Sequence, residues 1–422
     1  MTIRGVFWVV LILLIGSYAG AILTDSILFY RLVYLTGGIL VVSFLWSLFA
    51  VAKLSVRRSE RVHRHQVGQV FEERFEINNR FPFFRLWIEV LDQCPLPGKA
   101  GSRVLSWIGG NQKRAYISYT QLHTRGLFPL GPTTLISGDP FGFFRVKRVF
   151  KEKESLLVLP YVEEIEKFSS PPGVLPGGRA IRRRTPESTP QAAGVREYMP
   201  GDSLNRIHWP ITVKRDRLMV KEFEQDPHSD VWIIIDGQES VHRRSANPYR
   251  HSQNDLVWWR SFNVEIPADT FEYSMTAAGS IANYYIKQGR AVGVICDGQI
   301  QVAITAERGE RQLNKILDSL AYLEPKGETS ISSLVEAQTR HLPRGSTIVL
   351  ITPSTAPIIE ITYHQLQQKS LWPVFVYIDG DLIASDEDNK NVRKSNTIWN
   401  IPVIRISSQD TIKQELERGP SL

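Results

Sequence analysis

Two long uncharged segments near the amino terminus most constrain what this chain can fold into. No charged residue occurs from Gly5 to Leu23, and a second uncharged segment extends from Leu32 to Ala52. Each is close to the ~20 residues that an α-helix needs to cross about 30 Å of hydrocarbon. Backbone polar groups in lipid must bond within their own segment, which favours helices. We therefore expect residues 1–56 to form a transmembrane hairpin with helices at about 5–23 and 32–52, joined by a turn from Thr24 to Arg31.

A cleaved signal peptide is the alternative for the first segment, because Arg4 precedes it and Ala19-Gly20-Ala21 resembles a cleavage site. The segment is long for a signal core, however, and a second span follows almost at once, so the hairpin is favoured. Cytoplasmic flanks carry the excess of Lys and Arg. We expect a two-span protein of the cell membrane with both termini in the cytoplasm. The flanking cations are Arg4, Lys53, Arg57, Arg58, Arg61 and Arg64.

The basic stretch from Arg57 to Arg64 follows the second span directly. Cations in this position are attracted to anionic lipid head groups, each contributing ~1 kcal/mol. We therefore expect the stretch to lie against the membrane surface. A nucleic-acid-binding arm is the alternative interpretation, and the adjacent membrane segment argues against it.

The chain as a whole has the composition of a globular protein with two or three domains. It has 422 residues, of which 43% are hydrophobic and 22% charged, so wholesale disorder is excluded. The only two cysteines are Cys94 and Cys296. This excludes a disulfide scaffold and a Cys-rich zinc module, and it suits a reducing compartment.

Residues 57–165 are expected to form an all-β, immunoglobulin-like sandwich. Short alternating apolar stretches are separated there by Pro, Gly and Asn signals. The turn Gly138-Asp139-Pro140-Phe141-Gly142 lies between apolar residues and is interpreted as structural. No catalytic motif is found in this region. The expected strands are 67–77, 85–91, 115–119, about 130–136 and 156–159.

Residues 166–225 are interpreted as a connecting loop followed by a signature segment. Pro-Pro-Gly at 171–173 and Pro-Gly-Gly at 176–178 interrupt any periodicity. Arg179 and the run Arg182-Arg183-Arg184 follow. Arginines bind carboxylates and phosphates, so an anion or an acidic partner is one interpretation, and a solvated charge run is the other.

Residues 226–422 alternate strands with helices, which predicts an α/β domain. Strands that are apolar on both faces and alternate with helices indicate a mostly parallel sheet covered on both sides. Ligands of such sheets lie beyond the carboxyl ends of the strands. The residues at those ends are Asp236, Asp297, Thr352 and Asp379. The expected strands are 231–235, 291–296, 347–351 and 372–378, with helical periodicity at 271–285 and 313–320.

The segment from Gly194 to Trp209, continuing to Leu218-Met219-Val220-Lys221-Glu222-Phe223-Glu224, closely resembles the signature of the bacterial family called domain of unknown function 58. The Asp139-Pro140-Phe141-Gly142 turn and the two-span amino terminus resemble that family too. The resemblance implies a doubly wound von Willebrand factor A-like domain after the β-sandwich. It also implies association with MoxR-type AAA+ ATPases, and in some members with transglutaminase-like membrane proteins. The signature residues are Arg196, Glu197, Tyr198, Pro200, Gly201, Asp202, Arg206, His208 and Trp209.

The resemblance also implies a cation site at the carboxyl edge of the sheet. Such domains bind Mg²⁺ or Mn²⁺, which prefer oxygen ligands, through an Asp-x-Ser-x-Ser loop, a Thr and a second Asp. Here Asp236 and Ser240 are kept, Gln238 replaces the middle Ser, and Pro353 stands where the second Asp is expected. The matching Thr is Thr329. Three of five ligands survive, so we expect a degenerate face that binds with or without metal.

An apparent insertion from His242 to Asp269 contains Trp258-Trp259-Arg260. Aromatic and Arg side chains are typical interface anchors, so this segment is interpreted as a partner-binding loop or as a packed lid over the degenerate site. Its place after the first α/β strand puts it at the edge where the metal face is expected.

Enzyme motifs are absent from the sequence. It contains no Gly-x-x-x-x-Gly-Lys-Ser/Thr phosphate loop, no His-Glu-x-x-His and no Gly-x-Ser-x-Gly elbow. His208 beside Trp209 raises acid/base chemistry. We instead expect His208 to join Arg196, Glu197, Asp202 and Arg206 in a buried ion-pair network.

These observations predict a non-enzymatic, membrane-anchored adaptor for a MoxR-type AAA+ ATPase. Asp236, Ser240 and Thr329 would form its binding face. The alternatives are a metal-dependent hydrolase that uses Asp236 with Asp297 or Glu239, and a structural protein of the cell envelope.

Overall fold

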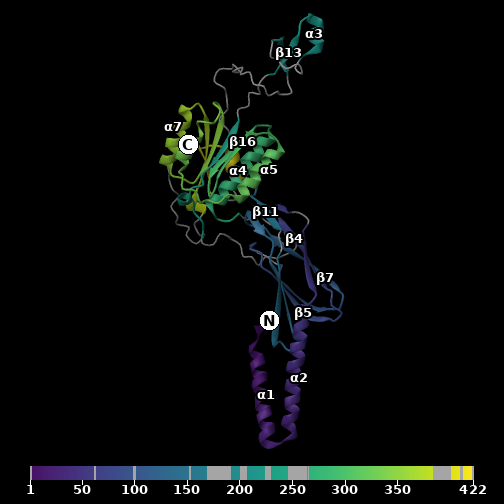
Figure 1. Cartoon of the computed structure of the whole chain (residues 1–422). Helices are drawn as coiled ribbons and strands as arrows, with labels where there is room; N and C mark the ends of the chain where they lie inside the picture. The colour runs from purple at the N-terminus through teal and green to yellow at the C-terminus, as the bar shows by residue number, and fades with distance from the viewer. Residues whose placement is uncertain are drawn as a thin grey trace. The chain divides into compact units, whose positions relative to one another are not determined.

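The computed structural model describes most of the chain as two compact units. The β-rich unit comprises Met1–Tyr161, Asn247–Ala268 and Leu317–Tyr322, and the α/β unit comprises Val162–Ala246, Asp269–Ile316 and Leu323–Leu422. Figure 1 labels their helices and strands. The described residues are 2–60, 63–97, 101–151, 154–168, 192–199, 207–223, 230–245, 264, 266–383, 401–408 and 412–420.

The β-rich unit begins with the two expected helices, α1 (Gly5–Thr24) and α2 (Ile27–Phe49). They contain 20 and 23 residues and are long and apolar enough to cross a membrane. The predicted turn from Thr24 to Arg31 was too long. Asp25, at φ 43° and donating its N–H to the carbonyl of Ala21, already ends α1. The second helix therefore starts at Ile27, and Arg31 lies inside it.

Small side chains line the contact between α1 and α2. A Cβ on Gly20 would lie 2.8 Å from the ring of Phe29, so only glycine permits that approach. Thr36, Ser43 and Ser47 are buried on α2. The Thr36 hydroxyl donates to the carbonyl of Leu32 at 2.7 Å, which satisfies it within the helix. The packing therefore places small residues inward, and the hydroxyls of Thr36 and Ser47 bond to carbonyls of their own helix.

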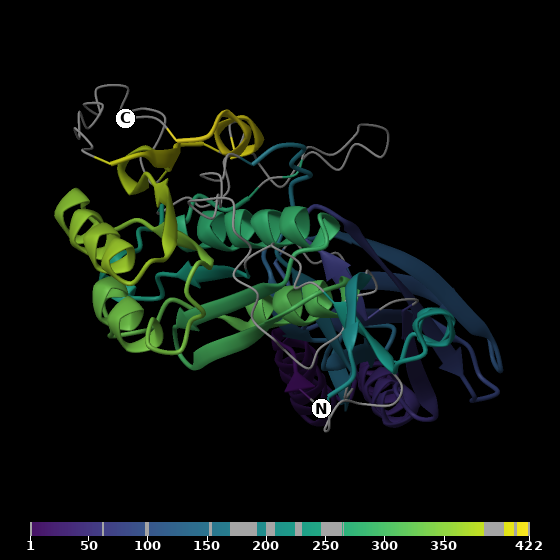
Figure 2. The same ribbon diagram turned by 90° about the horizontal axis from the view of Figure 1, so that it is seen from above.

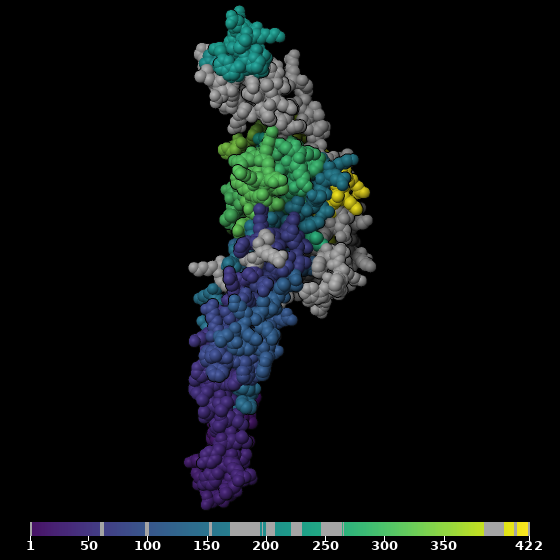
Figure 3. Space-filling model, turned by 90° about the vertical axis from the view of Figure 1, so that its right-hand side faces the viewer, coloured from purple at the N-terminus to yellow at the C-terminus, as the bar shows by residue number. Residues whose placement is uncertain are grey.

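Large apolar side chains point away from this contact. The hairpin is the purple part of Figure 3. Such a surface is unfavourable in water and suited to lipid. Its most exposed members include Ile12, Ile22, Leu23, Leu28 and Tyr34.

Among its described residues, the β-rich unit has eleven strands in three sheets, of orders β1-β10-β9-β5-β6, β2-β4-β7 and β3-β11-β8. The five strands predicted from the sequence are confirmed as β4, β5, β7, β9 and β11. The others were missed because their apolar alternation is short or interrupted by charge. The bounds are β1 (Thr2–Ile3), β2 (Leu54–Glu60), β3 (Arg64–Gln66), β4 (Val70–Asn79), β5 (Arg85–Asp92), β6 (Arg103–Ile108), β7 (Lys113–Gln121), β8 (Gly126–Pro129), β9 (Thr133–Gly138), β10 (Phe144–Phe150) and β11 (Ser155–Leu159).

Alternate residues of these strands build the core. Phe75 and Ile77 of β4 are fully buried against Ile88 and Val90 of β5. A second cluster joins Val67 and Phe71 to Leu156 and Val158, and Val264 packs against it. Val264 of the predicted insertion 242–269 thus packs on the core of the β-rich unit.

Arg58 corrects the expectation that the whole basic stretch lies against lipid. It sits in β2, is buried, and forms ion pairs with Glu73 of β4 and with Asp92 of β5, the latter at 3.2 Å. Burial raises the pKa of Glu73, which the Arg58 guanidinium opposes. Arg58 is therefore a counterion in the core, because its alternate position on β2 points it inward. Arg61 lies outside the described residues.

The α/β unit contains a six-stranded sheet of order β16-β15-β14-β17-β18-β19, parallel except for the edge strand β16. All four predicted strands and both predicted helices are confirmed. The strands are β14 (Val231–Ile235), β15 (Val292–Asp297), β16 (Gln301–Glu307), β17 (Thr347–Thr352), β18 (Trp372–Ile378) and β19 (Val403–Ile406). The helices are α4 (Thr270–Lys287), α5 (Glu310–Tyr322), α6 (Ile331–Gln338), α7 (Ala356–Gln368), α8 (Gly380–Ile383) and α9 (Ile412–Arg418). Of α5, residues up to Ile316 belong to this unit and Leu317–Tyr322 to the β-rich unit.

Both faces of this sheet are covered by helices. Ile234, Leu350 and Phe375 form one cluster with apolar residues of α6 and α7. Ile233 and Val349 alternate with them and point to the other face, and α4 contacts β14, β15, β17 and β18. Figure 2 shows these helices beside the strands. Burial on two faces explains why the strands are continuous apolar runs.

Replacing Arg58 by Met should destabilise the β-rich unit by about 3–5 kcal/mol, because Glu73 and Asp92 would stay buried without their shared cation. Hydrogen exchange of the β4 and β7 amides, measured on the full chain in detergent micelles, would report the loss. Arg57→Met is the matched control, since Arg57 is exposed on the same strand; its effect should stay within about 0.5 kcal/mol. Equal protection in both variants would contradict the role given to Arg58.

Candidate functional site

The carboxyl edge of the α/β sheet gathers the residues predicted at its strand ends. Ile235 pairs with Cys296 of β15 on one side and with Ile351 of β17 on the other. Asp236, Asp297 and Thr352 therefore follow at the same level. This confirms the predicted juxtaposition of these three residues.

Asp236 is buried, and both oxygens of its carboxylate accept hydrogen bonds. Oδ2 accepts hydrogen bonds from the hydroxyls of Thr352 at 2.6 Å and Ser354 at 2.8 Å. Oδ1 accepts from the backbone N–H of Gln238 at 3.2 Å. The Thr352 hydroxyl also accepts from the N–H of Ser354 at 2.9 Å. The hydroxyls of the residues before and after Pro353 thus donate to the carboxylate. The family pattern instead has a second Asp at the position of Pro353.

Two glycines allow the connections after β14 and α5 to touch. The N–H of Gly327 donates to the carbonyl of Gly237 at 2.9 Å, and Glu239 donates back to the carbonyl of Gly327 at 3.0 Å. A Cβ on Gly327 would lie 2.1 Å from the carbonyl oxygen of Asp297, and one on Gly237 would lie 2.2 Å from it. No side chain fits at either glycine. The connections after β14, β15 and α5 therefore pack backbone to backbone.

Ser240 and Thr329 are exposed on the loops that these bonds join. Ser240 lies in the 3₁₀ turn Glu239–Val241. Thr329 precedes Ser330, whose hydroxyl caps α6 by accepting from the N–H of Ser333. The predicted face is therefore divided. Asp236 faces inward as its support, while Ser240 and Thr329 face solvent.

The described residues contain no group of three His, Cys, Asp or Glu side chains that could hold a metal ion. At Asp236, the donated hydrogens of Thr352 and Ser354 occupy lone pairs that a cation would use. One lone pair of Oδ1 stays open to a Mg²⁺ or Mn²⁺ ion, since that oxygen accepts the N–H of Gln238 with the other. Metal binding therefore stays a prediction from the family resemblance.

His242 is a residue of the edge that sequence reasoning missed. Its Nε2 lies 2.9 Å from the carbonyl oxygen of Asp236, and its Nδ1 lies 3.0 Å from the hydroxyl of Thr270. The ring meets the edge of Phe271, with 4.9 Å between centroids. His242 thus ties the end of β14 to the start of α4. A single His at the start of the predicted insertion gave no signal of this contact.

The ends of the predicted insertion 242–269 lie side by side. Arg244 forms an antiparallel bridge with Asp269, and the Asp269 carboxylate caps α4 by accepting from the N–H of Phe271 at 2.8 Å. Trp258, Trp259 and Arg260 lie outside the described residues, so the choice between a partner-binding loop and a lid stays open.

Asp379, the fourth predicted edge residue, has a structural role. It is buried and accepts hydrogen bonds from the Arg405 guanidinium and from the N–H groups of Asp381 and Leu382. Burial, together with the Asp379 and Asp381 carboxylates, raises the pKa of nearby Tyr377. These contacts fix the start of α8.

The signature segment forms an antiparallel pair, β12 (Ala192–Glu197) with β13 (Met219–Phe223), and the short helix α3 (Trp209–Arg215). His208 caps α3, and its Nδ1 accepts from the N–H of Ile211 at 3.4 Å. Its role is therefore local and structural.

The predicted buried ion-pair network around His208 is wrong for Glu197. Glu197 pairs with Arg217 at 3.4 Å, and both side chains are exposed. The N–H of Tyr198 donates to the carbonyl of Leu218 at 2.8 Å, and Trp209 is 61% exposed. Glu197 at the end of β12 and Trp209 at the start of α3 therefore lie on exposed surface. Pro200, Gly201, Asp202, Arg206 and the side chain of Arg196 lie outside the described residues.

Comparison with known proteins matches this same segment. The family model described as "Protein of unknown function DUF58" matches residues 194–257. The uncharacterized protein YeaD of Bacillus subtilis (strain 168) is 22% identical over 189 residues, which cover 44% of this chain and 39% of YeaD. The chain thus spans well under half the length of that relative.

Similarity to solved structures is low. A CARDB domain from Pyrococcus furiosus is 10% identical, with a TM-score of 0.19, over 25% of this chain and 92% of that one. Proximal thread matrix protein 1 from the mussel byssus is 12% identical, with a TM-score of 0.26, over 45% of this chain and 46% of that one. At these scores neither likeness supports an argument about fold or function.

Replacing Thr352 by Val should destabilise the α/β unit by about 1–3 kcal/mol, because a buried carboxylate would lose a donor and the N–H of Ser354 an acceptor. Hydrogen exchange of the β14 and β17 amides would measure it. Thr355→Val changes the same atoms at an exposed position and should stay within about 0.5 kcal/mol. An unchanged Thr352→Val variant would show that the carboxylate does not depend on this hydroxyl.

Proposed function

We propose that the chain is a non-enzymatic adaptor anchored in the cytoplasmic membrane. The proposal starts from the premise that the chain belongs to the DUF58 family. In this proposal it works with a MoxR-type AAA+ ATPase in the assembly or remodelling of protein complexes. The observation that supports it most directly is the exposure of Ser240 and Thr329 at the carboxyl edge of the sheet. Their loops are held in place by the hydrogen bonds of Asp236 and by the backbone contact between Gly237 and Gly327.

The membrane anchor rests on α1 and α2. Both are long enough to span the hydrocarbon, and their outward side chains are large and apolar. Arg4 and Lys53 lie at the two open ends of the hairpin, whereas the turn contains Asp25. The positive-inside rule then directs both termini to the cytoplasm. A transglutaminase-like membrane protein is a second partner that this location would permit.

The α/β unit supports a von Willebrand A-like interpretation of the binding face. Its open, mostly parallel sheet ends at an edge built from several loops, which is where such sheets bind ligands. A preorganised surface loses little conformational entropy on binding. Ser240 and Thr329 offer hydroxyls there to a partner's polar groups, with or without a metal ion.

The bonding of Asp236 favours an adaptor over a hydrolase. A general base or nucleophile needs a lone pair within reach of the substrate. Three of the four lone-pair sites of the Asp236 carboxylate already accept hydrogen bonds, from Thr352, Ser354 and Gln238, and burial keeps the side chain out of reach of a substrate. Since the sequence has no phosphate loop, any ATP would be hydrolysed by the partner.

The double variant Ser240→Arg, Thr329→Arg should reduce co-purification of an AAA+ ATPase by about tenfold or more, because two long cations would block a polar contact. The full chain would be solubilised from its native membrane, with and without Mg²⁺ and ATP. Gln288→Arg is the control, since Gln288 is exposed at the end of α4, before β15 begins.

Each outcome has a defined meaning. Recovery of the ATPase with the control but not with the double variant would support the proposed face. Equal recovery in both would show that the partner binds elsewhere. A preparation without any ATPase under all conditions would contradict the partner, and turnover of a substrate lost on Asp236→Ala would favour the hydrolase.

A further inference from the structure

One stripe of α2 does not face α1. Thr36, Ser43 and Ser47 are buried, whereas the stripe that follows the i, i+3 and i+4 spacing is largely exposed. From Tyr34 to Phe49 it spans about 22 Å of helix axis. Its members, which we call the α2 track, are Tyr34, Leu35, Gly38, Ile39, Val42, Leu45, Trp46 and Phe49.

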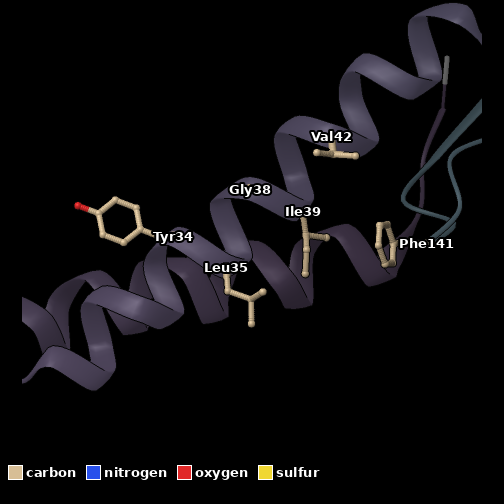
Figure 4. A pocket seen from close by; sticks show the side chains of 6 residues that line it. All are labelled: Tyr34, Leu35, Gly38, Ile39, Val42 and Phe141. Atoms are coloured by element: carbon tan, nitrogen blue, oxygen red, sulfur yellow. The ribbon is translucent and has the colours of Figure 1, made fainter.

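The first half of the track is a hollow of about 310 Å³, shown in Figure 4. Phe141, from the turn between β9 and β10, closes one side of it. That turn is fixed, because the carboxylate of Asp139 accepts from the N–H groups of Phe141 at 3.0 Å and Phe144 at 2.6 Å. A Cβ on Gly38 would meet no atom within 4 Å, so this glycine leaves the floor of the hollow open.

The second half is a hollow of about 350 Å³ that shares Val42 with the first. Aromatic rings from the loop before β5 line it opposite α2. Trp46 meets Phe84 edge to face at 5.6 Å between centroids, and Phe49 stacks on Phe81 at 5.6 Å. The two hollows thus adjoin at Val42, and together they make up the apolar groove of the α2 track.

Arg85 lies at the end of this groove. It is 3% exposed; its Nη2 donates to the carbonyl of Ala52 at 3.1 Å, and its Cζ lies 5.0 Å from the centroid of Phe81. Its Nε has no hydrogen-bond partner, and no carboxylate pairs with it within the described part of the chain. A buried cation without an anion is unfavourable, and burial lowers the pKa of Arg85. At this end of the groove, the positive charge of Arg85 is therefore not neutralised by any acidic side chain of the described residues.

We propose that the α2 track binds one anionic phospholipid of the bilayer, with its phosphate on Arg85 and an acyl chain along the groove. The proposal rests on the membrane anchor of the proposed function. The depth agrees, because 23 helical residues span about 35 Å and exceed the hydrocarbon by about 5 Å. Phe49 and Arg85 then lie at head-group level, where aromatic side chains gather.

Charge complementarity favours an anionic phospholipid over the apolar face of another helix as the occupant of the groove. A second transmembrane helix would cover the apolar residues but would leave the Nε of Arg85 unpaired. A phosphate oxygen accepts from a guanidinium in a strong charge-assisted bond. The chain attached to that phosphate needs an apolar path, and the track supplies one through Val42 to Gly38.

The test is native mass spectrometry of the full chain in detergent, titrated with phosphatidylglycerol. One lipid should bind, and Arg85→Gln should weaken it about tenfold, since a charged bond is lost. Arg80→Gln is the matched control, because Arg80 is an exposed cation in the same loop and should leave binding unchanged. Gly38→Leu should also weaken binding, because its side chain would fill open space in the groove without meeting protein.

Phosphatidylcholine, diacylglycerol and inorganic phosphate separate the sources of affinity. Weaker binding of the first two supports an anionic lipid. Competition by inorganic phosphate at the same concentration as lipid would overturn the proposal in favour of a simple anion site. Should Arg85→Gln fail to fold, Gly38→Leu decides, and wild-type affinity in that variant would overturn it.

Alkaline extraction of native membranes separates this proposal from the proposed function. A chain released by alkali is not membrane-spanning, and the anchor fails together with the lipid site. A chain that stays in the membrane but binds phosphatidylglycerol and phosphatidylcholine equally, with Arg85→Gln unchanged, contradicts only the lipid site.

Discussion

The buried carboxylate of Asp236 is the interaction on which the α/β unit's exposed edge depends. A charge at the end of a central strand must be met by donors, and Thr352, Ser354 and Gln238 meet it. Those bonds hold the connection after β17 against the end of β14. With Gly237 and Gly327 in backbone contact, the loops that display Ser240 and Thr329 have a rigid base. The same acid that resembles a metal ligand thus acts as internal support.

The β-rich unit treats its basic residues in two different ways. Arg58 is buried between Glu73 and Asp92, which makes it a core counterion. Arg85 is also buried, but it faces aromatic rings and the carbonyl of Ala52 instead of a carboxylate. The difference lies in the neighbouring strands, since β4 and β5 present Glu73 and Asp92 toward Arg58. It gives one arginine a structural role and leaves the other available to an anion.

Sequence patterns predicted the elements whose burial is simple. β14 and β18 were predicted with their observed bounds because both of their faces are covered, and Asp236 was found because it directly follows β14. Ser354 and His242, which also bond to Asp236, were not predicted, because they meet it only in the folded structure. Arg58 looked like a surface cation for the same reason: its acids lie 15 and 34 residues away. The start of α2 at Ile27 depended on one left-handed residue, Asp25, which no hydropathy pattern indicates.

The central claim is that the exposed edge around Ser240 and Thr329 contacts an AAA+ ATPase at the membrane. A photo-crosslinking amino acid placed at position 240 or 329 of the full chain, in its native membrane, tests it most directly. The account predicts adducts with peptides of one AAA+ ATPase from both positions, and none from position 288. Adducts with that ATPase from position 288 alone, or none from any position, would contradict it.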